Sequence, residues 1–139
     1  MPITAEKTAH IFQKVARICA ANQAVLAAYV FGSTVRPGKK IPDDIDVAVL
    51  LDDKHMATFS VTGFASELEK AFACRIDLVI LNRAGELLKY HVRRDGILVF
   101  DRVPTMRKQF EIRGRKTYED FLYLHKHYVR SVLYGEKHG

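Results

Sequence analysis

The chain has 139 residues, of which 48% are hydrophobic. This length suits one domain over residues 1–139 and leaves little room for a second domain that recognises a substrate. The longest apolar run, residues 24–31, is far too short to span a bilayer. Lysine and arginine outnumber aspartate and glutamate by 22 to 16, which gives a net charge of +6, but no DNA-reading module or aromatic-basic RNA motif accompanies it.

The first predicted element is a helix over about residues 4–22, with Thr4 as its cap. The residues before it contain no apolar stretch of the signal-peptide type. Cys19 and Cys74 lack the spacing of a metal site, and we expect both to be buried, reduced thiols. A cytoplasmic protein is therefore expected.

A buried strand over about residues 25–31 leads directly into Gly32 and Ser33. Small residues at the end of a strand let backbone N–H groups approach phosphate oxygens closely, and a serine adds a hydroxyl donor. The segment Gly32–Lys40 also loosely matches a P-loop, but it has one residue too many and lacks the hydroxyl after the lysine. We therefore predict a phosphate-binding turn at Gly32 and Ser33.

Two carboxylates follow ten residues later, at the start of a strand over about residues 45–51. Side chains alternate along a strand, so Asp44 and Asp46 lie on one face while the apolar residues point to the other. Adjacent carboxylates repel each other unless a cation lies between them, and Mg²⁺ held by carboxylates and substrate phosphates is the usual solution. The alternative explanation is turn chemistry after Pro42.

A helix is expected within residues 55–72, followed by a strand over about residues 75–81. Asp77 lies near the start of this otherwise apolar strand, where a carboxylate is costly unless it is solvated, paired or metal-bound. Two-metal transfer chemistry needs a third group that holds the second ion and takes a proton from the attacking hydroxyl. Asp77 is the candidate for this role, and the alternative is a salt bridge with Arg75.

A helix over about residues 84–94 and a strand over about residues 97–101 complete the core, whose expected extent is about residues 24–102. We interpret Asp95 and Asp101 as turn and strand-end residues. Both are therefore predicted to lie outside the site.

A C-terminal helical segment is expected over about residues 104–135, beginning at Pro104 and ending at Gly135. Its second half is rich in tyrosine and histidine, which leaves two interpretations open: packing against its own domain, or a surface for a partner. His125 and His127 diverge on a helix and cannot chelate one ion. The basic cluster in residues 107–116 is either a solvated helix face or an attraction for an acidic partner.

Together these motifs resemble the minimal nucleotidyltransferases of the DNA polymerase beta-like superfamily. The resemblance covers about residues 24–102 and rests on Gly32-Ser33, Asp44-Ile45-Asp46 and the strand that holds Asp77. It implies a nucleotidyltransferase fold of the α/β (α+β) class, with a small mixed sheet flanked by helices and a long C-terminal helix. The chain departs from the family pattern at Arg36-Pro37-Gly38, where Arg-Gly is common, and at Asp43, where a serine is common.

The resemblance also implies which residues form the site. They are Gly32, Ser33 and Arg36 for the triphosphate, and Asp44, Asp46 and Asp77 for catalysis and for two Mg²⁺ ions. Arg36 is equally well explained as an ordinary exposed loop arginine.

The implied substrate is ATP, and the implied partner is a small, all-helical HEPN ribonuclease toxin. Stand-alone members of the family typically pair with such toxins, so the expected function is transfer of AMP to a tyrosine of the toxin, as its antitoxin. Transfer to a small molecule or to an RNA end uses the same triad and stays open. A binding module that neutralises its partner by contact alone is the third hypothesis.

Overall fold

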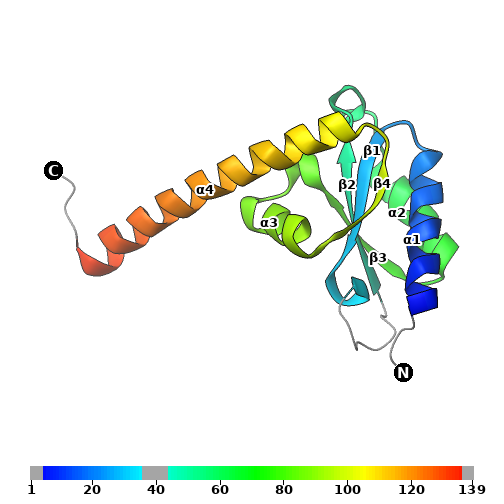
Figure 1. Ribbon diagram of the computed structural model, residues 1–139, viewed down its shortest axis with the longest axis horizontal. Coiled ribbons are helices and arrows are strands. Elements are labelled where there is room, and N and C mark those ends of the chain that lie inside the picture. The colour runs from blue at the N-terminus through cyan, green and yellow to red at the C-terminus, as the bar shows by residue number, and fades with distance from the viewer. Residues whose placement is uncertain (1–4, 36–43, 136–139) are drawn as a thin grey trace.

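The computed structural model describes residues 5–35 and 44–135 of the chain. Its helices are α1 (Ala5–Ala20), α2 (Val61–Phe72), α3 (Glu86–Asp95) and α4 (Pro104–Tyr134). Its strands are β1 (Val25–Phe31), β2 (Asp44–Leu51), β3 (Arg75–Ile80) and β4 (Ile97–Asp101). Figure 1 shows one sheet with helices on both faces and the long α4 reaching away from it. None of the helices in the described residues combines the length and apolar character that a membrane span needs.

The strands form one mixed sheet in the order β3-β2-β1-β4. Strands β2 and β3 run parallel, whereas β1 is antiparallel to both β2 and β4. Parallel neighbours need a long crossover, and α2 provides it between β2 and β3. The predicted mixed sheet, its flanking helices and the long C-terminal helix are all confirmed.

One face of the sheet is closed by α1 and α2 over an entirely apolar core. Alternation along β2 sends Val47 and Val49 to this face, where both are fully buried. Leu68 of α2 and Val15 of α1 are also fully buried there. The apolar residues of α1 therefore pack against the sheet.

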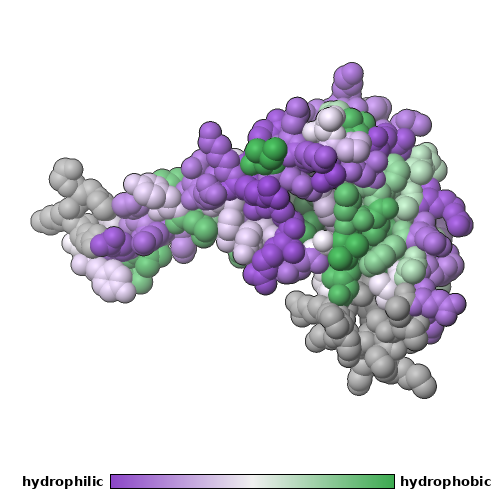
Figure 2. Space-filling view, viewed as in Figure 1, coloured by the Kyte–Doolittle hydropathy of each residue, from purple (hydrophilic) through white to green (hydrophobic). Residues whose placement is uncertain are grey.

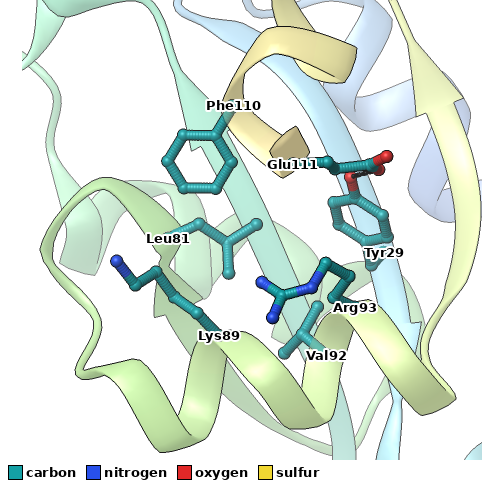
Figure 3. A pocket seen from close by; sticks show the side chains of 7 residues that line it. All are labelled: Tyr29, Leu81, Lys89, Val92, Arg93, Phe110 and Glu111. Atoms are coloured by element: carbon teal, nitrogen blue, oxygen red, sulfur yellow. Dashed lines mark hydrogen bonds between the residues drawn. The ribbon is translucent and has the colours of Figure 1, made fainter. Parts of the chain in front are cut away.

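The other face of the sheet is covered by α3 and by the first half of α4. Val92 of α3 and Phe110 of α4 pack there against Ala48 and Leu50 of β2. Polar groups join this face as well, since the Tyr29 hydroxyl donates a hydrogen bond of 2.6 Å to Glu111 of α4. Tyr29, Val92, Phe110 and Glu111 line a cavity between the helices and the sheet (Figure 3). Its volume is only about 10 Å³, so the helices fit closely on the sheet.

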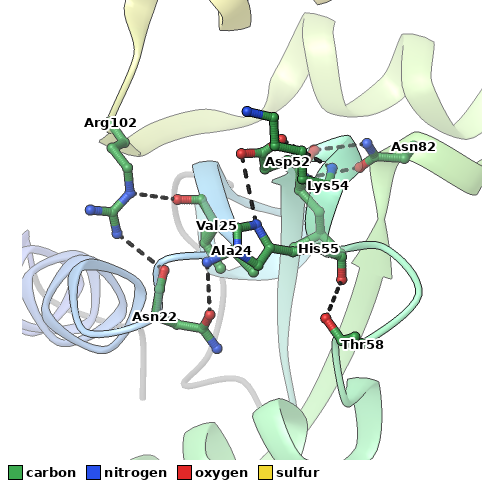
Figure 4. A network of polar contacts seen from close by, with 10 residues as sticks. Asn22, Ala24, Val25, Asp52, Lys54, His55, Thr58, Asn82 and Arg102 are labelled. Atoms are coloured by element: carbon green, nitrogen blue, oxygen red, sulfur yellow. Dashed lines mark hydrogen bonds and ion pairs between the residues drawn. The ribbon is translucent and has the colours of Figure 1, made fainter.

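Arg102, just after β4, ties the end of α1 to the start of β1. Its guanidinium donates hydrogen bonds of 2.9–3.1 Å to the backbone carbonyls of Cys19, Ala20, Asn22 and Val25. The last carbonyls of a helix have no partner within the helix, and a guanidinium with five donors can satisfy several of them. Figure 4 shows Arg102 reaching across to this turn.

The helix predicted within residues 55–72 begins only at Val61. Ser60 sets this start because its hydroxyl accepts a hydrogen bond of 3.0 Å from the N–H of Gly63. The residues before it form a short 3-10 turn, Asp53–His55, instead of a helical turn.

The two cysteines differ in their surroundings. Cys19 is fully buried in α1, as predicted, and burial raises the pKa of its thiol to about 12. Cys74 lies in the turn between α2 and β3 and is only half-buried, so the prediction of a buried thiol is wrong there. Both are free thiols.

Helix α4 begins at Pro104, as predicted, and Gly135 ends it with a positive φ of 64°. Its first half is held to the sheet by Arg107, which donates hydrogen bonds of 2.9 Å to Asp101 and 3.2 Å to Glu111. Its second half projects away from the sheet (Figure 1). The large side chains there are exposed, so packing against the chain's own domain accounts only for the first half.

Candidate functional site

The end of β1 and the starts of β2 and β3 meet at one edge of the sheet. The register places Asp46 opposite Phe31 on one side and opposite Asp77 on the other. Gly32 follows Phe31 directly, in a 3-10 turn that covers Gly32–Val35. The glycine turn and the predicted carboxylates, which are separated in the sequence, are therefore brought together by strand pairing.

The three predicted carboxylates lie on the same face of the sheet. Asp44 and Asp46 share the face of Ala48 and Leu50, while Asp77 shares that of Val79, which packs with them. This is the face covered by α3 and α4, and the carboxylates occupy the end of it beyond the apolar cluster. The alternation predicted from the sequence is confirmed.

Asp46 and Asp77 are close enough for a protonated Asp46 to donate a hydrogen bond to Asp77. Burial raises the pKa of Asp46, the negative charges of Asp77 and Asp44 raise it as well, and together these causes bring it to about 6. A carboxylate held against two others is destabilised when it is ionised. Such a site favours a cation beside Asp46 at neutral pH.

Gly32 cannot be replaced without disturbing this carboxylate. Its φ of 74° lies in the left-handed region that side chains disfavour. A Cβ added at Gly32 would lie 3.0 Å from Asp46 Cγ and closer still to Asp46 Oδ2. The glycine therefore makes room for the carboxylate of Asp46, in addition to the phosphate approach that the sequence predicts for it.

The salt bridge considered for Asp77 does exist. Arg75 Nε lies 3.9 Å from Asp77 Oδ1, and the two side chains are 78% and 47% exposed. A pair at this distance in water is worth little free energy, about 0–1 kcal/mol. Asp77 thus contacts both Arg75 and Asp46, and the weak ion pair leaves its carboxylate available.

The donor set suits a magnesium ion. Within residues 5–35 and 44–135, no three His, Cys, Asp or Glu side chains are grouped closely enough to hold one ion. Magnesium does not require three, because it is commonly bound by one or two carboxylates together with substrate phosphates and water. Asp46 and Asp77 supply the close pair, and Asp44 lies on the same face of β2.

A groove of about 680 Å³ opens beside the glycine turn. It lies between the turn and the exposed side of α3, and its lining residues are Phe31, Gly32, Val35, Leu88, His91, Arg94 and Asp95. No sequence pattern pointed to His91 or Arg94, and Asp95, which was predicted to lie outside the site, lines this groove. Nothing in the local pattern of α3 distinguishes these positions, since only the packing of α3 on the sheet brings them to the turn.

Two predicted nucleotide-binding residues are described only in part or not at all. The backbone of Ser33 lies in the 3-10 turn that follows β1, at the position predicted for phosphate binding. Arg36 lies outside the described residues. Both stay predictions.

A mixed sheet that sets a glycine turn against paired carboxylates defines the class of nucleotidyltransferase folds. The chain belongs to the family described as polymerase beta, nucleotidyltransferase, whose model matches residues 13–105. That match contains the turn, both neighbouring strands with their carboxylates, and the whole of α3.

Among curated proteins, the chain is similar to protein adenylyltransferase MntA of Aphanizomenon flos-aquae (strain 2012/KM1/D3). The two are 30% identical over 81 residues, which are 52% of this chain and 54% of that protein. The chain thus matches about half the length of this relative.

Solved structures show the same fold at low identity. A structure of the toxin-antitoxin MntA-HepT matches with a TM-score of 0.69 and 21% identity, over 90% of this chain and 98% of that chain. A structure of the toxin-antitoxin with AMP-PNP matches with a TM-score of 0.71 and 23% identity, over 88% and 98%. The complex of tri-AMPylated Shewanella oneidensis HEPN toxin with MNT antitoxin matches with a TM-score of 0.70 and 21% identity, over 91% and 98%.

Proposed function

We propose that this protein is a magnesium-dependent nucleotidyltransferase that transfers AMP from ATP to a tyrosine hydroxyl of a HEPN-domain toxin, and so acts as its antitoxin. The observation that carries the proposal is the contact of Asp46 with Asp77 directly against Gly32. The carboxylate pair favours a bound cation, and the glycine turn beside it suits phosphate. A nucleoside triphosphate bound to magnesium would satisfy both the carboxylates and the turn.

Relatives support the finer parts of the proposal. The similar protein of Aphanizomenon flos-aquae is named a protein adenylyltransferase. A relative of the same fold was crystallised with AMP-PNP, an ATP analogue, and another with an AMPylated HEPN toxin.

The proposed reaction forms one bond and breaks one. The tyrosine oxygen attacks the α-phosphorus of ATP, the bond from that phosphorus to the bridging oxygen breaks, and pyrophosphate leaves. Magnesium, held by the close pair Asp46 and Asp77 together with substrate phosphates and with Asp44 on the same face, would supply charge neutralisation at the phosphates.

The chain's own residues have separate roles in this step. Asp77, whose carboxylate is 47% exposed, takes the proton from the attacking hydroxyl. The backbone N–H groups of Gly32 and Ser33 hold phosphate oxygens. Asp46, placed between β1 and β3, positions the phosphates relative to Asp77.

The first test is labelling by purified protein with magnesium and ATP that is labelled at the α-phosphate, in host lysate. We expect label on a small protein with the native chain and none with Asp44→Asn/Asp46→Asn. The matched control is Asp53→Asn, which makes the same change in the exposed turn beyond the opposite end of β2. It should label like the native chain.

The other outcomes separate the remaining hypotheses. Label found only on RNA or on a small molecule would show that this molecule, and not a tyrosine, is the acceptor. No label anywhere, with toxicity still neutralised by Asp44→Asn/Asp46→Asn, would show neutralisation by contact and refute the proposed activity.

A further inference from the structure

The second half of α4 presents an exposed apolar stripe. Beyond Tyr118 the helix projects from the domain, as Figure 1 shows, and Figure 2 shows hydrophobic side chains among the hydrophilic ones along it. Leu122 is 45% exposed, Tyr128 65%, Val132 58% and Leu133 70%. Exposure of so many large apolar side chains on one element is a mark of an interaction surface.

This stripe continues the face of α4 that packs against the domain. In the first half, Phe110 packs in the apolar cluster, Gly114 is buried against Arg93, and Tyr118 stacks on Tyr90 at a ring distance of 4.3 Å. Steps of three and four residues keep side chains on one face of a helix. The same steps lead onward to Phe121, Leu122, His125, Tyr128, Val129, Val132 and Leu133.

A basic and aromatic groove joins the stripe to the proposed active site. It has a volume of about 390 Å³, and its lining residues are Tyr90, Arg93, Arg94, Arg115, Tyr118 and Glu119. Arg94 also lines the groove beside Gly32, so the two grooves are neighbours. A polypeptide lying on the stripe would therefore be led past three arginines toward the carboxylates.

We propose that the stripe from Tyr118 to Leu133 is the docking surface for the acceptor protein, and that this partner presents an apolar helical face bordered by acidic residues. The inference rests on the proposed function, since it takes the partner to be the protein that receives AMP. Helices bind amphipathic helices through such i, i+3, i+4 stripes. The arginines of the groove match acidic side chains at the border of the partner's apolar face.

Charge and area argue against a second copy of the chain. Helix α4 carries seven basic and three acidic residues, and the whole chain has a net charge of +6, so two copies would repel each other. The stripe exposes on the order of 500 Å² at ordinary side-chain areas. Two stripes face to face would bury on the order of 1,000 Å², the lower limit for a specific interface. An acidic partner that also fills the arginine groove buries more and gains from the charge.

The test compares two matched variants for binding to the purified HEPN-domain protein of the host. Leu122→Asp places a charge in the stripe, whereas Tyr123→Asp places the same charge on the opposite side of the helix, where Tyr123 is 63% exposed. We expect Leu122→Asp to weaken binding by about tenfold or more and Tyr123→Asp by less than about twofold. Both side chains are exposed, so both variants should fold.

AMP transfer is measured on the same samples to keep the two proposals apart. Loss of binding in Leu122→Asp alone supports the docking surface whether or not AMP is transferred. Equal binding by both variants, or no binding by the native chain, overturns it even if transfer to another acceptor occurs. A native dimer that Leu122→Asp dissociates, with HEPN binding unchanged, would assign the stripe to a second copy instead.

Discussion

The two faces of the sheet are built from the same strands but differ in their contents. The face under α1 and α2 is closed and apolar, with Val47, Val49 and Leu68 fully buried. The face under α3 and α4 combines a smaller apolar cluster with Asp46, Asp77 and the Tyr29–Glu111 hydrogen bond. One face therefore stabilises the fold, which lets the other carry carboxylates that repel each other.

The largest expected effect is on catalysis, and it comes from the face under α3 and α4. Asp46→Asn should lower the rate of AMP transfer by about a thousandfold or more, because it removes the carboxylate that we propose holds metal and positions the phosphates. Initial rates with the labelled acceptor measure it, and circular dichroism checks that the fold is kept. A rate within about tenfold of the native value would remove Asp46 from the catalytic machinery.

On the face under α1 and α2, a substitution should change stability instead of catalysis. Leu68→Ala deletes a fully buried side chain and should lower the free energy of unfolding by about 2–5 kcal/mol. Urea unfolding measures this loss, and Leu87→Ala on α3, where the leucine is 55% exposed, is the control that should change it little. Equal losses in both variants would contradict the division between the faces.

A substitution at Arg102 tests how much the link between α1 and β1 contributes to stability. Arg102→Lys should lower the free energy of unfolding by about 2–3 kcal/mol. A lysine cannot make all the hydrogen bonds that the guanidinium donates to four backbone carbonyls. Thermal unfolding is the measurement, with Arg17→Lys on the exposed side of α1 as control. A loss below about 0.5 kcal/mol would show that water replaces the guanidinium.

The smallest expected effect is on stability, and it comes from the repulsion between the carboxylates on the face under α3 and α4 when no metal is bound. The folded-state pKa of Asp46 is about 6, above its ordinary value of 3.8, so the native state binds more protons than the unfolded state between these values. Metal-free native protein should therefore lose stability as pH rises from about 4 to 6. Above that range Asp46→Asn should be more stable than the native chain. The difference should be only about 1 kcal/mol, because solvent screens part of the repulsion.

Chemical denaturation in EDTA at pH 5 and pH 8 measures this difference. Added magnesium should stabilise the native chain and leave Asp46→Asn unchanged. If the native chain is the more stable one at pH 8 without metal, the repulsion inferred for Asp46 is wrong.

Much of the fold followed from local patterns. The alternation in β2, the apolar run of β1, and Pro104 with Gly135 as the ends of α4 depend on neighbours in the chain, and each was predicted correctly. The glycine turn and the paired aspartates were visible for the same reason. The start of α2 was predicted only to within several residues, because the Ser60 cap was not recognised.

The amino-acid sequence by itself therefore determined the elements, their apolar faces and the chemistry offered by Gly32 and Asp46. Only the tertiary structure decided what those elements meet. It paired Asp46 with Asp77, brought His91 and Arg94 to the turn, and directed half of α4 away from the domain. These contacts join residues far apart in the chain, and periodicity and propensity, which act over one or two turns, contain no information about them.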